Sequence, residues 1–207
     1  MLQPMEILVA TYNRHKIEEL EPMFPSHRLL APSDVGLGAL DIEETGVDYF
    51  DNAMIKAKAL YQRSGLPTLA DDSGLSVAAL GGAPGIHSAR YGALDGSAKL
   101  SSPERNALLL EAMKGIGDRR CAFYCCLVFL YGEDRFLSVQ ETCPGLLALS
   151  PSGAGGFGYD PIVYLPEFGR TVAELSPDEK NRVSHRGKAS RLMNAMLQAA
   201  GNPASRE

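Results

Sequence analysis

Apolar and polar positions alternate along the chain in patterns that change from strand-like to helical. Residues 6–10 and 120–131 are apolar runs rich in β-branched, aromatic or cysteine residues and predict buried strands. The turn at Gly132-Glu133-Asp134 predicts a hairpin with residues 136–140, and a third strand is expected near 146–149. Helical spacing predicts helices near 14–23, 48–63 and 103–113. Strands alternating with helices, followed by a hairpin meander, predict an α/β fold with a mixed sheet.

Two adjacent carboxylates follow the apolar run 66–70, which predicts a buried strand, bounded by Ser73-Gly74, with these charges at its end. Asp71 and Asp72 should lie on opposite faces of an extended chain, because neighbouring side chains alternate. Buried charges are costly unless positive groups or a metal meet them, and Mg²⁺ often uses one or two carboxylates plus substrate phosphates. The alternative is that both are solvated turn residues before the next element. This stretch alone leaves both interpretations open.

The first strand leads into Thr11-Tyr12-Asn13-Arg14-His15-Lys16. Thr11 or Asn13 can cap the following helix, whose free backbone N–H groups favour an anion, and Lys16 would add a positive charge. The spacing differs from the Gly-x-x-x-x-Gly-Lys phosphate loop, so an ordinary strand–helix junction is the alternative.

Two further segments carry candidate chemistry. Glu43 and Glu44 precede the second helix and are either solvated carboxylates or a third acidic ligand for a metal at the aspartate pair. Residues 153–161 hold four glycines and two aromatic residues. This composition favours a ligand loop, which a ligand approaches closely and a ring stacks on, over the alternative of a simple turn.

The segment 180–191 contains five Lys or Arg residues and no acid. The interruption at Ser184-His185-Arg186-Gly187 predicts that one helix ends and another begins there. The basic residues form either a solvated face or a set of donors for carbonyl and phosphate oxygens.

Composition limits the remaining classes of protein. A length of 207 residues with 45% hydrophobic and 22% charged residues suits one soluble domain, expected over 1–200, with a frayed tail at 201–207. The net charge of −5 argues against a general polyanion-binding surface. A transmembrane-length apolar run and a leader pattern are both missing, so we expect a cytoplasmic protein. The four cysteines are expected to be buried reduced thiols, ahead of a metal site or disulfides.

Seven short motifs, in order and spanning residues 7–190, closely resemble the inosine/xanthosine triphosphate pyrophosphatase (ITPase-like, dITP/XTP pyrophosphatase) family. They are Thr11-x-Asn13-x-x-Lys16, Glu43-Glu44-Thr45-Gly46, Asn52-Ala53-x-x-Lys56-Ala57, Ala70-Asp71-Asp72-Ser73-Gly74-Leu75, Gly81–Ile86 with Ser88–Tyr91, Gly155–Pro161 and Ser184-His185-Arg186-Gly187. Two departures are Tyr12, which stands where small or polar residues are common in the family, and Glu141, which stands where the family commonly has Gly.

The resemblance implies a fold and an activity. The fold would be an elongated mixed β-sheet flanked by helices, in two lobes with an active-site cleft between them. The activity would be Mg²⁺-dependent hydrolysis of the deaminated purine nucleotides ITP, dITP and XTP to the monophosphate and pyrophosphate. Water would attack the α-phosphorus. The protein would be a homodimer that binds a small-molecule nucleotide, without nucleic acid or membrane partners.

The resemblance also implies residue roles. Thr11, Asn13 and Lys16 would hold the phosphates, and Lys56 and Lys180 would add positive charge. Glu43 or Glu44, Asp71 and Asp72 would bind Mg²⁺, with Asp72 the base for the attacking water. Ser73, Gly158 and Tyr159 would contact the substrate, Phe157 would stack on the purine and Asp160 would shape the base pocket. His185 and Arg186 would donate to the 6-keto oxygen, which adenine lacks.

Two other functions compete with this interpretation. A Maf-type nucleotide pyrophosphatase would share the fold but should lack the segment Ser184–Gly187. A non-catalytic nucleotide sensor would not need the water-activating pair Asp71-Asp72. Mg²⁺-dependent turnover separates an enzyme from a sensor.

Overall fold

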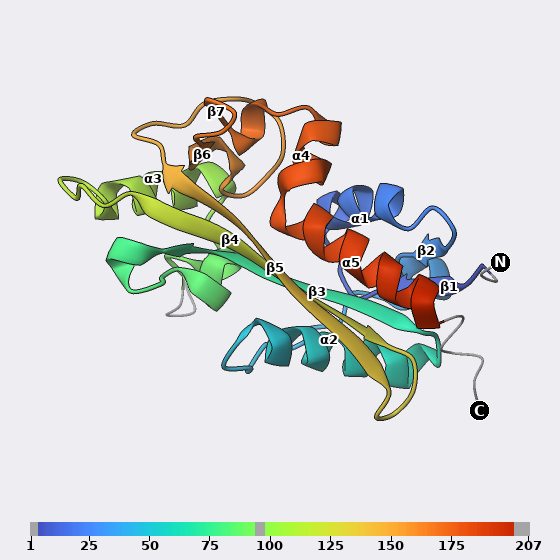
Figure 1. Cartoon of the computed structure of the whole chain (residues 1–207). Coiled ribbons are helices and arrows are strands. Elements are labelled where there is room, and N and C mark those ends of the chain that lie inside the picture. The colour runs from blue at the N-terminus through green and yellow to red at the C-terminus, as the bar shows by residue number, and fades with distance from the viewer. Residues whose placement is uncertain (1–3, 94–97, 201–207) are drawn as a thin grey trace. The chain divides into compact units, whose positions relative to one another are not determined.

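The computed structural model describes residues 4–93 and 98–200, and its strands form one mixed sheet (Figure 1). The strand order is β2-β1-β3-β4-β5-β6-β7. The strands are β1 Glu6–Val9, β2 Arg28–Leu30, β3 Thr68–Val77, β4 Arg120–Leu130, β5 Phe136–Leu147, β6 Val163–Leu165 and β7 Arg170–Thr171. β1 pairs in parallel with β2 and β3, whereas β6 pairs antiparallel with β5 and β7. The predicted α/β fold with a mixed sheet is confirmed.

The helices begin and end where capping chemistry allows. They are α1 Arg14–Leu20, α2 Tyr49–Ser64, α3 Ser102–Ala112, α4 Pro177–Val183 and α5 His185–Ala200. Asp48 caps α2 by accepting from the Asp51 amide, and Gly65 ends it in the left-handed conformation. α1 stops earlier than predicted, because Pro22 cannot continue an α-helix and residues 21–23 form a 3-10 turn. The predicted break between the last two helices is confirmed, since Ser184 is extended.

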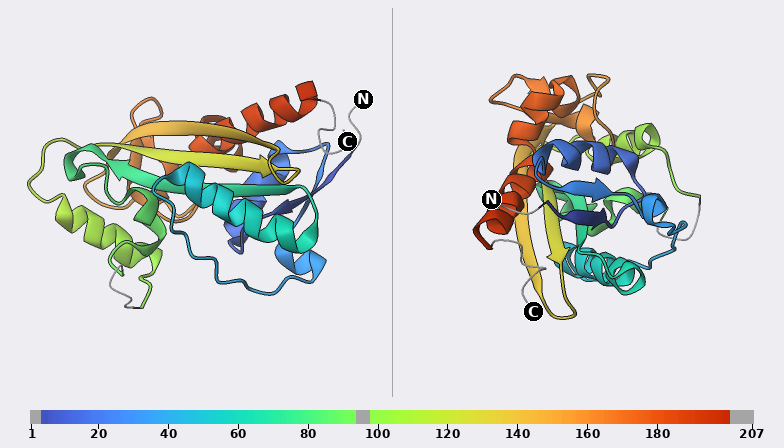
Figure 2. Two further views of the ribbon diagram at one scale, coloured as in Figure 1. Left: turned by 90° about the horizontal axis from the view of Figure 1, so that it is seen from below. Right: turned by 90° about the vertical axis from the view of Figure 1, so that its right-hand side faces the viewer.

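The chain divides into two compact units, each built from separate segments. The first has described residues within 4–72, 125–141 and 186–200. Its strands are covered by α1 and α5 on one face and by α2 on the other (Figures 1 and 2). Its core joins Ile7, Leu69 and Phe129 from the strands to Leu20 of α1 and Met193 of α5.

The second unit comprises residues 73–124 and 142–185, of which 94–97 are not described. Its core joins Leu75 of β3 and Phe123 of β4 to Leu109 of α3 and Ile162 next to β6. The expectation of a single domain over 1–200 stays a prediction, and the predicted frayed tail at 201–207 lies outside the described residues.

Two predicted strand boundaries are wrong. The strand expected to end at the two aspartates, before Ser73-Gly74, continues to Val77, because cationic side chains meet the carboxylates. The strands expected at 136–140 and near 146–149 are one strand, β5, which continues through Pro144. β5 pairs with β6 at Leu146 and Leu147, after Pro144. The pairing with β6 therefore does not need the N–H that Pro144 lacks.

The cysteines agree with the prediction of reduced thiols. Cys121, Cys125, Cys126 and Cys143 are all buried and free. Among the helices described, none has both the length and the apolar character to cross a membrane.

Candidate active site

Asp71 and Asp72 lie in the middle of β3 and contact different helices. Asp71 Oδ1 is 2.5 Å from Lys16 Nζ of α1, and its Oδ2 accepts from Arg186 Nε of α5 at 2.7 Å. Asp72 Oδ1 accepts from Lys56 Nζ of α2 at 2.6 Å. Since α1 and α5 cover one face of the first unit and α2 covers the other, the predicted opposite orientation of the two carboxylates is confirmed.

Asp71 is a buried anion held by cations. Burial leaves only 1% of the residue exposed and by itself raises the pKa of the carboxyl, but Arg186 and Lys16 outweigh it and hold the pKa well below its usual range. The Cys125 thiol also donates to Oδ2 at 3.5 Å. Arg186 is anchored a second time, because its NH1 donates to Glu19 Oε2 of α1 at 2.6 Å. This carboxylate is therefore ionised at neutral pH.

Asp72 has the opposite electrostatic character. Burial raises the pKa of its carboxyl and exceeds the lowering effect of Lys56, while Glu44 raises it further. Its Oδ2 is buried and has no hydrogen-bond partner among the described residues. Two neighbouring carboxyls with pKa values shifted in opposite directions are typical of sites that assign them different roles.

Lys56 connects the aspartates to the acidic loop before α2. Its Nζ lies 3.0 Å from Glu44 Oε1 and donates to the backbone oxygen of Asp71 at 2.8 Å, in addition to its contact with Asp72. Burial lowers the pKa of Lys56, but Asp72 and Glu44 outweigh it, and the net shift is upward. Of the two predicted acidic ligands, Glu44 is half-buried and contacts this cluster, whereas Glu43 is exposed.

The loop between β1 and α1 has the predicted capping geometry. Asn13 Oδ1 accepts from the His15 amide, and Thr11 Oγ1 accepts from the Asn13 amide, both at 3.1 Å. Lys16, one turn into the helix, contacts Asp71. Thus Lys16 joins the aspartate cluster, while Asn13 is an exposed cap.

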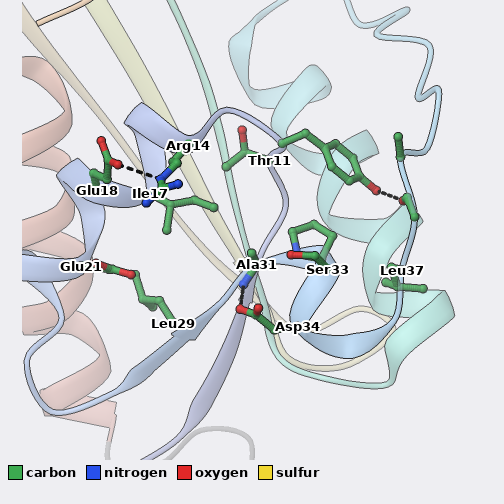
Figure 3. Close-up of a pocket in the computed structure, with 14 residues that line it drawn as sticks. Thr11, Arg14, Ile17, Glu18, Glu21, Leu29, Ala31, Ser33, Asp34 and Leu37 are labelled. Carbon is green, nitrogen blue, oxygen red and sulfur yellow. Dashed lines mark hydrogen bonds and ion pairs between the residues drawn. The ribbon is translucent and has the colours of Figure 1, made fainter.

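A pocket of about 600 Å³ lies beside this loop (Figure 3). Thr11, Ile17 of α1 and Leu29 of β2 line it, together with the acidic residues Glu18 and Asp34. The Tyr12 hydroxyl donates to the Gly38 backbone oxygen at 2.7 Å, which joins the two segments bordering the pocket. Its carboxylates disfavour phosphate, and the aspartate pair is not part of its lining.

In the second unit, Asp160 organises the glycine-rich loop. Its Oδ2 accepts from Lys180 Nζ at 2.6 Å and from the Phe157 amide at 2.8 Å. Lys180 Nζ also lies 5.0 Å from the centroid of the Phe157 ring. Gly156 has φ +67°, and a Cβ there would lie 2.1 Å from Asp160 Oδ2, so the loop requires glycine at this position.

The neighbouring loop residues are fixed by polar contacts. The Gly158 oxygen accepts from Asn106 Nδ2 at 3.1 Å, and the Tyr159 hydroxyl donates to the Ser88 oxygen at 2.9 Å. Burial raises the pKa of the Tyr159 hydroxyl, which therefore stays protonated. Ser73 is half-buried in β3.

His185 and Arg186 are adjacent in sequence and have different surroundings. The His185 ring stacks on Phe123, with centroids 4.8 Å apart and an interplanar angle of 13°. Arg186 belongs to the network of Asp71 and Glu19 described above.

The sequence assigned no role to three residues that support this site. Glu19 binds Arg186, Asn52 binds the backbone of Gly46, and Asn106 binds that of Gly158. A signal existed for the first two. Glu19 lies three residues after Lys16, and Asn52 four residues before Lys56, so each shares a helix face with a predicted site residue. The contact of Asn106 spans 52 residues and has no local signal.

Comparison with known proteins reveals close relatives. The sequence profile of the Ham1 family matches residues 7–196. The chain is 52% identical to a dITP/XTP pyrophosphatase of Treponema denticola over 89% of this chain and 94% of the relative. It is 45% identical to a dITP/XTP pyrophosphatase of Yersinia pestis, over 91% and 95% of the two chains. A solved structure of a HAM1 protein from Coxiella burnetii is 38% identical, with a TM-score of 0.85 over 95% of this chain and 100% of that one.

Proposed function

This chain belongs to the Ham1 family, and from that membership we propose that it is a nucleoside-triphosphate pyrophosphatase acting on deaminated purine nucleotides. It hydrolyses dITP, ITP and XTP to the monophosphate and pyrophosphate, which clears them from the nucleotide pool. The observation that carries the proposal is Asp72, a buried carboxyl with raised pKa that is held by Lys56 through one oxygen only.

A divalent metal ion, Mg²⁺, is the cofactor in this proposal, and the residues present fit it. Asp72 Oδ2 is a buried oxygen with no partner in the described part of the chain, and Glu44 shares Lys56 with it. Within residues 4–93 and 98–200, no group of three or more His, Cys, Asp or Glu side chains could hold a metal. Two carboxylates without a complete protein cage suit Mg²⁺, which completes its coordination with substrate phosphates and water. Asp72 and Glu44 would hold the ion, which neutralises phosphate charge and makes water more acidic.

Asp71 has a different role in this proposal from the metal ligand expected from the sequence. Both of its oxygens contact cationic side chains, so a metal ion would have to displace Lys16 or Arg186. We assign Asp71 to anchoring those two side chains, and we assign metal binding to Asp72 with Glu44.

The protein groups then divide the chemistry between them. Asp72 accepts the proton of the water that attacks the α-phosphorus, a task that suits a carboxylate whose pKa is raised. Lys16 and Lys56 supply positive charge beside it, which stabilises the negative charge that develops on the phosphate oxygens. Thr11 and Asn13 would bind the phosphates, and Ser73 would contact the substrate.

The glycine-rich loop and its neighbours would select the base. Phe157 stacks on the purine, and Gly158 and Tyr159 continue the same loop. Asp160 and Lys180 hold the Phe157 backbone and ring in place, so Lys180 supports the base pocket as well as adding charge. His185 donates to the 6-keto oxygen, and adenine, which lacks that acceptor, is rejected. Arg186 acts through Asp71, because its Nε and NH1 contact Asp71 and Glu19. A substrate cleft between two lobes, a homodimer and a cytoplasmic location stay predictions.

The test is pyrophosphate release from dITP, ITP, XTP, ATP and GTP, with and without Mg²⁺. We expect turnover of the first three only, dependent on Mg²⁺, and a loss of roughly 10²–10⁴-fold in Asp72→Asn. The control is Asp118→Asn, which removes an exposed carboxylate paired with Arg120 and should leave the rate unchanged. Absence of turnover of every nucleotide, or full activity of Asp72→Asn, would overturn the proposal.

A further inference from the structure

The acidic loop that carries Glu44 is attached to α2 by a side chain with no assigned role. The Gly46 amide donates to Asn52 Oδ1 at 2.9 Å. Asn52 lies in the first turn of α2 and is only 1% exposed. Its Nδ2 is buried too, and no described residue accepts a hydrogen bond from it. Because the buried Asn52 side-chain oxygen accepts a hydrogen bond from a backbone N–H, it fixes the loop at Gly46.

Gly46 rests directly on the start of the helix. A Cβ at this position would lie 2.5 Å from Asp51 Cβ and 2.7 Å from both the backbone nitrogen and Oδ1 of Asn52. The φ angle of Gly46 is outside the left-handed region, so close approach, rather than backbone conformation, explains the glycine. Any side chain here would push the loop away from α2.

The same helix face holds Glu44 at a second point. Lys56 follows Asn52 by four residues, and its Nζ lies 3.0 Å from Glu44 Oε1 and 2.6 Å from Asp72 Oδ1. Residues 37–46 contain no helix or strand, so these two contacts replace regular structure in placing the carboxylate.

We propose that Asn52 is a positioning residue that fixes Glu44 beside Asp72 for divalent-metal binding. The inference rests on the proposed function, which supplies the metal ion, and it identifies the residue that positions the metal ligand Glu44. Lys56 restrains the Glu44 side chain, and Asn52 restrains the backbone two residues later. Loss of the hydrogen bond between the Gly46 amide and Asn52 frees the loop and weakens the metal site while the fold is retained.

The experiment measures Mn²⁺ binding to the full chain by electron paramagnetic resonance, together with the Mg²⁺ concentration for half-maximal pyrophosphate release. Asn52→Leu keeps the approximate volume but removes the acceptor, and Gly46→Ala displaces the same contact from the other side. We expect each to raise the Mn²⁺ dissociation constant and the Mg²⁺ requirement by about 10-fold or more, the range found for outer-shell partners of metal ligands. The double variant should be no worse than the stronger single variant, because both changes break one contact.

Two further variants separate positioning from packing. Asn52→Asp keeps an acceptor oxygen for the Gly46 amide and should recover most of the metal affinity. Gln62→Ala removes an exposed amide from the same helix and should match the wild type. If Asn52→Leu unfolds, Gly46→Ala and Asn52→Asp still carry the comparison.

The outcomes distinguish this inference from the proposed function. Unchanged Mn²⁺ affinity in Asn52→Leu and Gly46→Ala would overturn the inference, even if the wild type hydrolyses dITP. A wild type that binds Mn²⁺ and hydrolyses none of the nucleotides would overturn the proposed function, and the binding data would still decide the role of Asn52.

Discussion

The neighbouring residues Asp71 and Asp72 contact different cationic side chains and therefore have different roles. Their opposite orientation could be predicted from the two-residue period of a strand. The sequence does not predict which aspartate anchors the cationic side chains, because Lys16 and Arg186 lie 55 and 115 residues away from Asp71 in sequence. Folding alone brings these cations to one carboxylate and leaves the other with Lys56 and an unpartnered oxygen within the described residues.

This difference predicts unequal costs of removing the charge. Asp71→Asn leaves Arg186 and Lys16 without their buried counter-ion and should lower the free energy of unfolding by roughly 3–5 kcal/mol. Asp72→Asn should cost less, because Lys56 keeps Glu44 as a counter-ion and burial, which raises the pKa of Asp72, already disfavours its charged form. Urea denaturation at pH 7 measures both, with Asp118→Asn as the exposed control. Equal losses for Asp71→Asn and Asp72→Asn would contradict the assignment.

The cysteines give a second prediction for single residues. Burial raises the pKa of Cys121 and of Cys126 to about 12, so almost no thiolate exists at pH 8. We expect the folded protein to react with less than one equivalent of a thiol reagent in minutes, and with four equivalents in urea, counted by absorbance of the released chromophore. Rapid labelling of two or more thiols in the folded protein would contradict the burial of these cysteines.

At the scale of elements, sequence patterns placed the interior of most helices and strands but missed how some strands continue. A strand that ends at Asp71 and Asp72 is the reasonable prediction, because charges are costly in a buried strand. It continues because Lys16, Lys56 and Arg186 come from three different helices to meet those charges. β6 and β7 have only three and two residues, too few for a periodic signal.

The loop that carries Phe157 provides a test at this scale. Gly156 and Gly158 both have positive φ, at +67° and +65°, so alanine at either position costs about 1–2 kcal/mol of backbone strain. Only Gly156→Ala also clashes with Asp160 Oδ2, since nothing lies within 4 Å of a Cβ at Gly158. We expect Gly156→Ala to lower the unfolding free energy by at least about 1 kcal/mol more than Gly158→Ala in matched urea titrations. Equal losses would mean that the contact of Asp160 with the loop is not maintained.

At the scale of the whole molecule, stability and metal binding depend on different groups. Each unit has an apolar core, and the carboxylates of the candidate metal site are already met by Lys56. The sequence predicted the mixed sheet from its periodicity. The division into units depends on contacts between distant segments, which periodicity does not contain.

Metal removal should therefore stop catalysis without unfolding the protein. We expect EDTA to abolish pyrophosphate release, to leave the circular dichroism spectrum unchanged and to shift the unfolding midpoint by less than roughly 2 °C, because little binding energy is linked to folding. Restoring Mg²⁺ should recover the activity fully. Unfolding in EDTA would indicate a structural metal instead.

The path of the chain through the two units restricts how such proteins can be recombined. The chain passes from one unit to the other after Asp72, Tyr124, Glu141 and His185. A single genetic crossover between homologues at any point within residues 73–185 therefore gives a chimera in which both units mix the two parents. Exchanging either core intact needs several crossovers, one of which separates His185 from Arg186. Substitutions in one segment of a core must therefore remain compatible with the distant segments of the same core, and a single crossover cannot exchange one unit without the other.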